Sequence, residues 1–172
     1  MDGPYVPLKY VNTYLVMFNH FSVTCPTSSP NYVSISGSCY YIEDTKMTYA
    51  DAQLNCHSKF GGSGILFEPR DVNTNKLVNT AAATLTSSAF HWFGINDFSI
   101  QGQYVYASDG QDVVNVMWHP GQPNDANHRC VYGYFSTSAG SFGNLVDNAC
   151  DLELYSICQA QNTGKEGTLK HL

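Results

Sequence analysis

Residues 90–97 read FHWFGIND, a short run of aromatic and apolar side chains that an Asn-Asp pair closes. A run of this length, bounded by residues that favour turns, predicts a β-strand. The next stretch, residues 101–110, reads QGQYVYASDG, in which Tyr104 and Tyr106 alternate with other residues before an Asp-Gly turn. We therefore expect strands at the centre of the chain.

Two helices are predicted on the N-terminal side of this strand. Thr48 stands as the N-cap of residues 49–60, in which apolar residues recur at i, i+4 and i+8 before two glycines end the helix. Asp71 caps a second helix that extends to about residue 85, since the Pro-Arg pair directly before it marks a helix start. The helices thus lie near the front of the chain.

Strands and loops account for the rest. Residues 31–43 alternate polar with apolar and aromatic residues around a Gly-Ser turn, as a β-hairpin does, and residues 64–67 read as a strand. Residues 111–129 are rich in Pro, Gly, Asn and Asp, and a loop this long in a compact domain is uncommon unless it is functional. Three more segments have β-like composition: residues 130–137, 141–150 and 154–160.

Composition narrows the class of protein. With 43% hydrophobic residues, the 172-residue chain can bury one real core. Its net charge is −6 and no segment clusters Lys or Arg, which excludes a nucleic-acid surface. The most apolar stretch, residues 14–18, is far too short for a membrane span, which needs about 20 apolar residues.

The six cysteines indicate the compartment. None belongs to a CxxC pair or to a cluster with zinc spacing, so three disulfides are the simplest interpretation, with six free thiols as the alternative. Disulfides predict a secreted, extracellular protein, although residues 1–24 contain no clear signal peptide. The chain also has no GxSxG motif, no phosphate loop and no unpaired cysteine nucleophile once disulfides form, so we do not expect an enzyme.

Several motifs in this order resemble the C-type lectin-like domain family. WFGIND is similar to the family's core strand motif, usually written WIGL, and the triplet QPN at residues 122–124 and the segment VDNAC at residues 146–150 fall where the family keeps its ligand-loop motifs. The resemblance implies an α+β fold, in which two helices flank antiparallel β-sheets and a long loop binds the ligand. We expect an N-terminal extension (1–24, a leader or extra strand), the lectin-like domain (25–160) and a flexible polar tail (161–172).

The resemblance also implies the disulfide pairing. Three bonds follow from it: Cys25 with Cys39, Cys56 with Cys158, and Cys130 with Cys150. The second would join the first helix to the last strand, and the third would hold the binding loops.

A calcium site is implied only in part. Sugar-binding members of the family hold Ca²⁺ through the first and third residues of an EPN or QPD triplet, an acid before the next cysteine, and the Asn and Asp of a WND motif. Here Gln122, Asn124 and Asp147 occupy three of these positions and are the candidate metal ligands. His128 stands where the family places the acid, and Val146 replaces the asparagine, so the expected calcium site is incomplete.

Two neighbours of this set complete the prediction. Arg129 adds positive charge beside His128, which disfavours a cation, whereas Asp125 could substitute for the missing acid if the loop is reshaped. The candidate carbohydrate-binding residues are Gln122, Asn124, Asp125, His128 and Asp147. An amide both donates and accepts hydrogen bonds, so the triplet QPN does not select one hydroxyl stereochemistry.

Aromatic residues near the loop are candidates for stacking on a sugar. Trp118, His119 and Tyr132 could each contact the apolar face of a sugar ring, although Trp118 is more simply a structural residue of the loop.

Two functions remain open. The first is a carbohydrate-binding lectin, with or without dependence on calcium, that has glycans or glycoproteins as partners and a role in innate immunity. The second is a lectin-like module that binds a protein or a surface ligand without calcium. No coiled coil or collagen stalk is present, so a monomer or small oligomer is expected.

Overall fold

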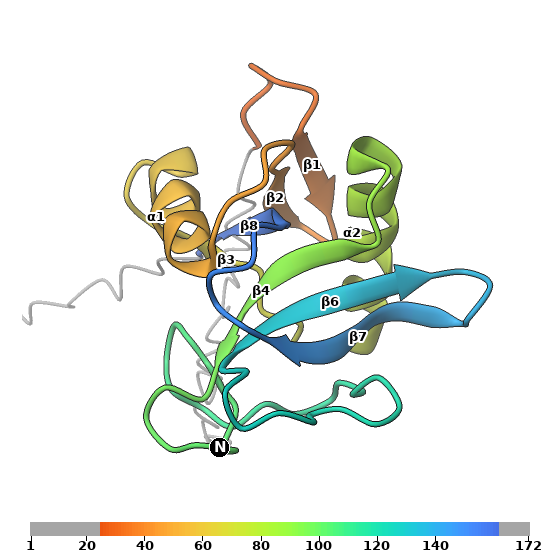
Figure 1. Ribbon diagram of the computed structural model, residues 1–172. Helices are drawn as coiled ribbons and strands as arrows, with labels where there is room; N and C mark the ends of the chain where they lie inside the picture. Colours follow the sequence, from red (N-terminus) through yellow and green to blue (C-terminus); the bar gives the residue numbers. More distant parts are fainter. Residues whose placement is uncertain (1–24, 162–172) are drawn as a thin grey trace, which may run out of the picture.

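The computed structural model describes residues 25–161, in which two helices flank a twisted sheet (Figure 1). The predictions for the extension (1–24) and for the tail beyond Gln161 lie outside the described residues. In chain order the elements are β1 (Tyr32–Ile35), β2 (Ser38–Ile42), α1 (Tyr49–Lys59), β3 (Gly64–Leu66), α2 (Val72–Thr86), β4 (Phe90–Asn96), β5 (Val105–Tyr106), β6 (Cys130–Ser136), β7 (Ser141–Asn148) and β8 (Tyr155–Ala160).

The strands form one sheet in the order β1-β2-β8-β4-β6-β7, with β3 beside β8 and β5 beside β4. The expected α+β fold with two helices is present. One pairing differs from the expected antiparallel sheets, because β4 and β8 run parallel, His91 opposite Tyr155 and Trp92 opposite Ser156. Parallel neighbours need a long crossover connection, and here the chain between β4 and β8 contains the long loop and the β6–β7 hairpin.

Both helices begin where the sequence predicts. Thr48 accepts a hydrogen bond from the backbone N–H of Asp51, and Asp71 accepts one from that of Thr74, so each satisfies an N–H group that its helix leaves free. The hairpin turn lies one residue earlier than expected. Ser36 and Gly37, not the Gly-Ser pair, both adopt left-handed backbone angles, as a two-residue hairpin turn with the right twist requires.

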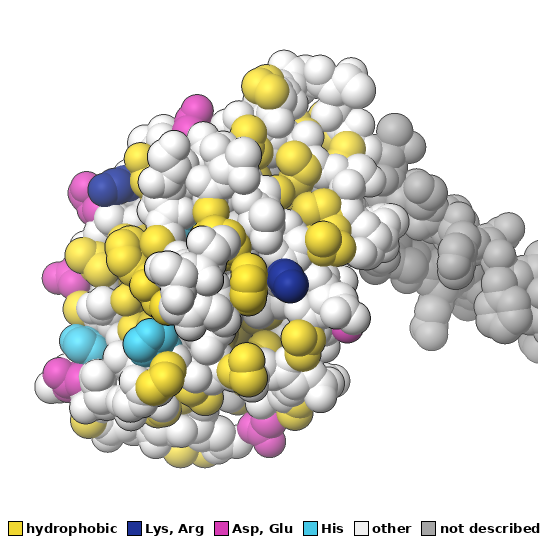
Figure 2. All heavy atoms as spheres, turned by 90° about the vertical axis from the view of Figure 1, so that its right-hand side faces the viewer, with side chains coloured by type: hydrophobic (Ala, Val, Ile, Leu, Met, Phe, Trp, Pro, Cys, Tyr) yellow, Lys and Arg dark blue, Asp and Glu magenta, His cyan; other side chains and the backbone are white. Residues whose placement is uncertain are grey.

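Strand β4 lies in the middle of the sheet and, apart from Phe90 at its start, it is buried on both faces. Trp92 packs into a cluster on the α1 side of the sheet, whereas Phe93 and Ile95 pack into a second cluster that includes Val78 of α2. A strand buried on both faces needs apolar residues without polar alternation, which explains the composition of FHWFGIND. Figure 2 shows that hydrophobic side chains also reach the surface on the side toward which the β6–β7 hairpin extends.

Three disulfides connect these layers, in the pairing that the resemblance implies. Cys25–Cys39 joins the segment before β1 to β2, Cys56–Cys158 joins α1 to β8, and Cys130–Cys150 joins the start of β6 to the segment after β7. Their partners are 14, 102 and 20 residues apart in the chain.

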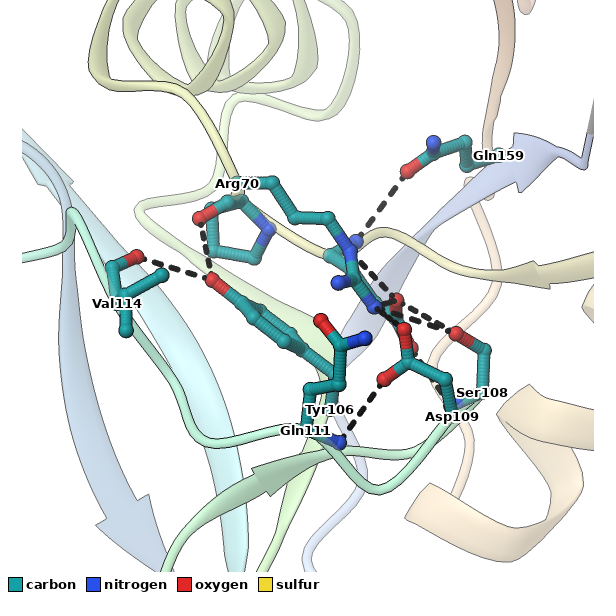
Figure 3. A network of polar contacts seen from close by, with 9 residues as sticks. Arg70, Tyr106, Ser108, Asp109, Gln111, Val114 and Gln159 are labelled. Carbon is teal, nitrogen blue, oxygen red and sulfur yellow. Dashed lines mark hydrogen bonds and ion pairs between the residues drawn. The ribbon is translucent and has the colours of Figure 1, made fainter.

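A buried carboxylate holds the segment before α2 against the turn after β5. The Glu68 side chain is 2% exposed and accepts hydrogen bonds from the backbone N–H and hydroxyl of Ser108 and from Arg70 at 2.6 Å. Arg70 also donates to Asp109, and its guanidinium lies 4.0 Å from the centre of the Tyr106 ring (Figure 3). The buried charge is thus compensated on several sides.

Tyr106 carries this network to the long loop. Its hydroxyl lies 3.1 Å from the carbonyl oxygen of Pro69 and 3.0 Å from that of Val114, as Figure 3 shows for Val114. Since Val114 is near the start of the loop, the contact fixes where the loop leaves the sheet.

His91 is a fully buried histidine at the start of β4. Its Nε2 atom lies 2.8 Å from the hydroxyl of Thr86, and its Nδ1 atom has no hydrogen-bond partner within residues 25–161. Burial disfavours the charged ring and lowers the pKa of His91 to about 4.

The buried His91 makes stability depend on pH. The unfolded chain takes up this proton near the ordinary histidine pKa of about 6.5, whereas the folded chain resists it down to about 4. The contribution of the neutral His91 ring to the free energy of unfolding is therefore complete above about pH 6.5. It decreases as the pH falls toward 4, and the loss at pH 5 is about 2 kcal/mol. We expect urea unfolding to show a smaller loss between these pH values for His91→Gln, and equal losses in the two proteins would contradict the assignment.

Candidate functional site

The long loop returns to the edge of the sheet before it reaches the triplet QPN. The N–H of Leu145 in β7 donates to the carbonyl of Met117, and the N–H of His119 donates to the carbonyl of Leu145, both at 2.8 Å. Trp118 between them turns inward, joins the core and packs on Tyr104 with ring centres 4.8 Å apart. This attachment fixes the start of the turn that follows.

A buried carboxylate holds the backbone of the triplet. Asp147 accepts hydrogen bonds from the backbone N–H groups of Asn124, at 3.1 Å, and Asp125, at 3.2 Å, and its side chain is fully buried. The peptide bond between Gln122 and Pro123 is cis. Because Asp147 binds the main chain, the side chains of Asn124 and Asp125 remain exposed to solvent.

His128 packs between two carboxylates. Its Nδ1 atom lies 3.8 Å from Asp147 Oδ2 and its Nε2 atom lies 3.8 Å from Asp125 Oδ2, too far for hydrogen bonds but close enough for electrostatic contact. The hydroxyl of Tyr104 donates to the carbonyl of His128 at 2.8 Å. The imidazole therefore covers the side of Asp147 on which the family places an acid.

Arg129 points away from this pair. Its Nε atom donates to Asp97 Oδ1 at 2.8 Å, and its Nη2 atom donates to the Asp97 carbonyl. Asp97, directly after β4, is buried and also accepts from the N–H of Gly102. The prediction that Arg129 adds charge beside His128 is therefore wrong, because the guanidinium is neutralised by Asp97.

Val146 provides no ligand atom. It is buried and pairs with Tyr132 across β6 and β7. Successive side chains of a strand point to opposite faces, so Val146 faces away from the side of the sheet that Asp147 faces.

Two buried polar atoms near the triplet lack partners within the described part of the chain. They are Gln122 Oε1 and His128 Nδ1. Buried polar atoms nearly always have a hydrogen-bond partner. These two atoms could therefore bind a polar ligand if a small movement of the loop exposed them.

The residues do not fit a calcium ion of the kind the family implies. Asp147 is the only carboxylate at the expected positions, and it already accepts two N–H groups, with an imidazole against it. The side chain of Val146 has no oxygen to offer, and calcium requires 6 to 8 oxygen ligands. Across residues 25–161, no three His, Cys, Asp or Glu side chains lie together so that they could hold a metal.

The structure brings four of the candidate carbohydrate-binding residues into direct contact, since Asn124, Asp125 and His128 surround Asp147. Gln122 is joined to them by the turn. The sequence did not identify Tyr104 or Asp97, which hold His128 and Arg129. No local motif marks them, because their partners lie 24 and 32 residues away in the chain.

The chain belongs to the C-type lectin family. Residues 45–160, more than half of the chain, match the family described as Lectin C-type domain. Its members are binding proteins rather than enzymes, as expected. None of the helices within residues 25–161 is long and apolar enough to cross a bilayer.

Individual relatives agree with this assignment. Lithostathine of Rattus norvegicus is 28% identical over 138 residues, which cover 80% of this chain and 79% of that protein. Collectin-10 of Gallus gallus is 32% identical over 123 residues, but the match spans 70% of this chain and only 40% of the collectin. The crystal structure of human lithostathine superposes with a TM-score of 0.68 at 22% identity, over 87% of this chain and 99% of that one, which shows a shared fold.

Proposed function

We propose that this chain binds neutral carbohydrate through the QPN loop and does so without calcium. The observation that carries the proposal is the burial of Asp147, whose oxygens accept the backbone N–H groups of Asn124 and Asp125. A carboxylate used in this way shapes the loop in place of a metal ion. The loop then needs no cation to hold its side chains in position.

The side chains around the triplet supply the groups that sugar hydroxyls require. Asn124 and Asp125 are exposed, the first with an amide and the second with a carboxylate. An amide donates and accepts, and a carboxylate accepts, so together they can pair with hydroxyls, which do both. Direct hydrogen bonds thus take the place of coordination through calcium.

Family and chemistry support an extracellular role. Membership of a lectin family favours a glycan as ligand. Three disulfides favour an oxidising compartment, since cytosolic thiols are kept reduced. We propose that the protein is secreted and recognises glycans or glycoproteins, with innate immune recognition as one use.

One observation favours the alternative, a protein or surface ligand. Phe98 and Ile100 are 50% and 60% exposed in the loop after β4. Gln101 ties this loop to the binding loop by donating to the carbonyl of Ala126 at 2.8 Å. Exposed apolar groups beside a polar loop are typical of an interface with another macromolecule.

Calcium should leave the protein unchanged. Since no complete set of ligands is present, adding millimolar calcium is expected to leave the melting temperature within about 1 °C, because a ligand raises it only by binding the folded state. Glycan binding on an array should be equal with calcium and with chelator. A calcium-dependent rise in melting temperature that chelator reverses would contradict the proposal.

A pair of variants tests the location of the site on the same array. Asn124→Ala removes an exposed amide of the triplet and should abolish most glycan binding, whereas Asn73→Ala removes an exposed amide on α2 and should leave it intact. If the wild-type protein binds no glycan and instead captures a protein through Phe98, the alternative function is favoured.

A further inference from the structure

Within residues 25–161, the face of the sheet opposite α2 carries a set of partly exposed aromatic rings. In β6, Val131 packs into the cluster that contains Val78 of α2. Successive side chains of a strand point to opposite faces, so Tyr132 and Tyr134 lie on the other face. Phe90 of β4 is the cross-strand partner of Tyr134 and shares this face. Phe90 is 40% exposed, and both tyrosines are half-buried.

These rings form a continuous row. Phe90 and Tyr134 stack with ring centres 5.6 Å apart and planes at 19°, and Phe90 meets Tyr132 edge-on at 5.5 Å. His119 meets Tyr134 edge-on, with ring centres 5.2 Å apart. We call Phe90, Tyr132, Tyr134 and His119 the aromatic platform. Rings held against one another in this way lose little further freedom when a ligand binds.

The platform is joined to the QPN loop through His119. The backbone N–H of Gln122 donates to the carbonyl of His119 at 2.9 Å, so the residue that ends the platform also begins the turn. Met117, two residues earlier and 65% exposed, lies on the same side because Trp118 between them turns inward.

The chemistry of the platform fits a neutral sugar. None of its four residues is Lys or Arg, so it offers no permanent positive charge to pair with a sulfate, phosphate or sialic acid. One face of a pyranose ring consists mainly of C–H groups, which pack on an aromatic ring, while its hydroxyls point outward from the edge. Asn144, the cross-strand partner of Tyr134, is half-buried on this face and places an amide beside the rings.

The QPN loop cannot provide such packing itself. Residues 122–129 contain no Phe, Tyr or Trp, so the loop offers hydrogen-bonding groups without an aromatic plane apart from the partly covered imidazole of His128. The two surfaces are therefore complementary, one polar and one aromatic, and they share a boundary at His119.

We infer that the aromatic platform is a second sugar subsite, which holds an inner residue of a neutral oligosaccharide whose terminal residue lies at the QPN loop. The inference rests on the proposed function. It makes the domain selective for glycan length, because a monosaccharide reaches only the loop whereas a longer chain reaches both surfaces.

The test compares two probes on variant proteins. Methyl glycosides of mannose and galactose report the loop alone, and the matching tri- to pentasaccharides report both surfaces. Phe90→Ala and Tyr134→Ser should each weaken oligosaccharide binding roughly three- to tenfold, as loss of an aromatic contact does, with methyl glycoside binding unchanged. Tyr134→Phe keeps the ring and should bind as the wild type does, and Leu77→Ala, an exposed apolar residue of α2, is the matched control.

Each other outcome overturns the inference in a recognisable way. Unchanged oligosaccharide affinity in Phe90→Ala and Tyr134→Ser, with melting temperatures close to that of the wild type, would rule out the platform as a subsite. Equal losses for both probes would assign the effect to the loop. Self-association that Phe90→Ala abolishes would make the face an interface between copies of the chain. A wild-type protein that binds no glycan would overturn the proposed function and this subsite with it.

Discussion

Replacing Cys56 and Cys158 together by alanine should lower the free energy of unfolding by about 5 kcal/mol. The two cysteines are 102 residues apart in the chain. Opening a loop of about 100 residues increases the conformational entropy of the unfolded chain, which lowers its free energy by about 4.7 kcal/mol. Both sulfurs are also fully buried in the cluster that contains Trp92, so the change removes packing as well. Urea unfolding under non-reducing conditions measures the loss.

The first disulfide is the matched control. Cys25 and Cys39 are only 14 residues apart, so their joint replacement by alanine should cost about 3 kcal/mol by the same relation. The order of the two losses is therefore the decisive result. A smaller loss for the Cys56–Cys158 pair than for the Cys25–Cys39 pair would show that loop closure does not govern stability here.

Gly133→Ala should lower the free energy of unfolding by about 3 kcal/mol. Gly133 lies in β6 against the ring of Phe93, and a Cβ atom there would have three ring carbons of Phe93 within 2.7 Å. Phe93 is fully buried and packs edge-on against Phe67 at 5.2 Å, so the ring has little room to move. Overfilling a packed core of this kind costs roughly 1–3 kcal/mol, and more where backbone must shift.

Two further proteins isolate the collision. Gly140→Ala changes a glycine of the β6–β7 turn that has no atom within 4 Å of its Cβ position but a φ of +64°, so it should cost only about 1 kcal/mol. The double variant with Gly133→Ala and Phe93→Leu should lose less free energy of unfolding than the two single variants lose in sum, because the smaller side chain at residue 93 leaves room for the added methyl group. Strict additivity would argue against the contact with Phe93.

The start of each helix can be predicted from the sequence because an N-cap residue interacts only with its neighbours in the chain. Thr48 and Asp71 need only the N–H groups three residues ahead of them, and those groups are fixed as soon as the helix forms. The hairpin turn lies one residue earlier than the sequence predicts, since a Gly-Ser pair and a Ser-Gly pair both favour turns. Cross-strand pairing of Ile35 with Ser38 decides between them, and it requires Ser36 to adopt a left-handed conformation.

Long-range contacts could not be predicted in the same way. The parallel pairing of β4 with β8 joins segments about 64 residues apart, and strand patterns alone do not give direction. For the candidate site, the resemblance predicts the positions of Gln122, Asn124 and Asp147. The partner of Arg129 cannot be predicted, because a cation next to the loop can turn either way and only the fold brings Asp97 within reach.

Because Asp147 binds the main chain, the conformation of the QPN loop does not depend on every side chain that the loop presents to solvent. The carboxylate binds N–H groups at positions 124 and 125, and every residue except proline has such a group. Exchanging the exposed side chain of Asn124 should therefore leave the backbone of the turn unchanged, whereas the side chain of Asp125 also accepts the backbone N–H of Asn127 at 2.8 Å. Residue 124 can thus be randomised in a library for altered recognition while Asp147 and Asp125 are kept fixed.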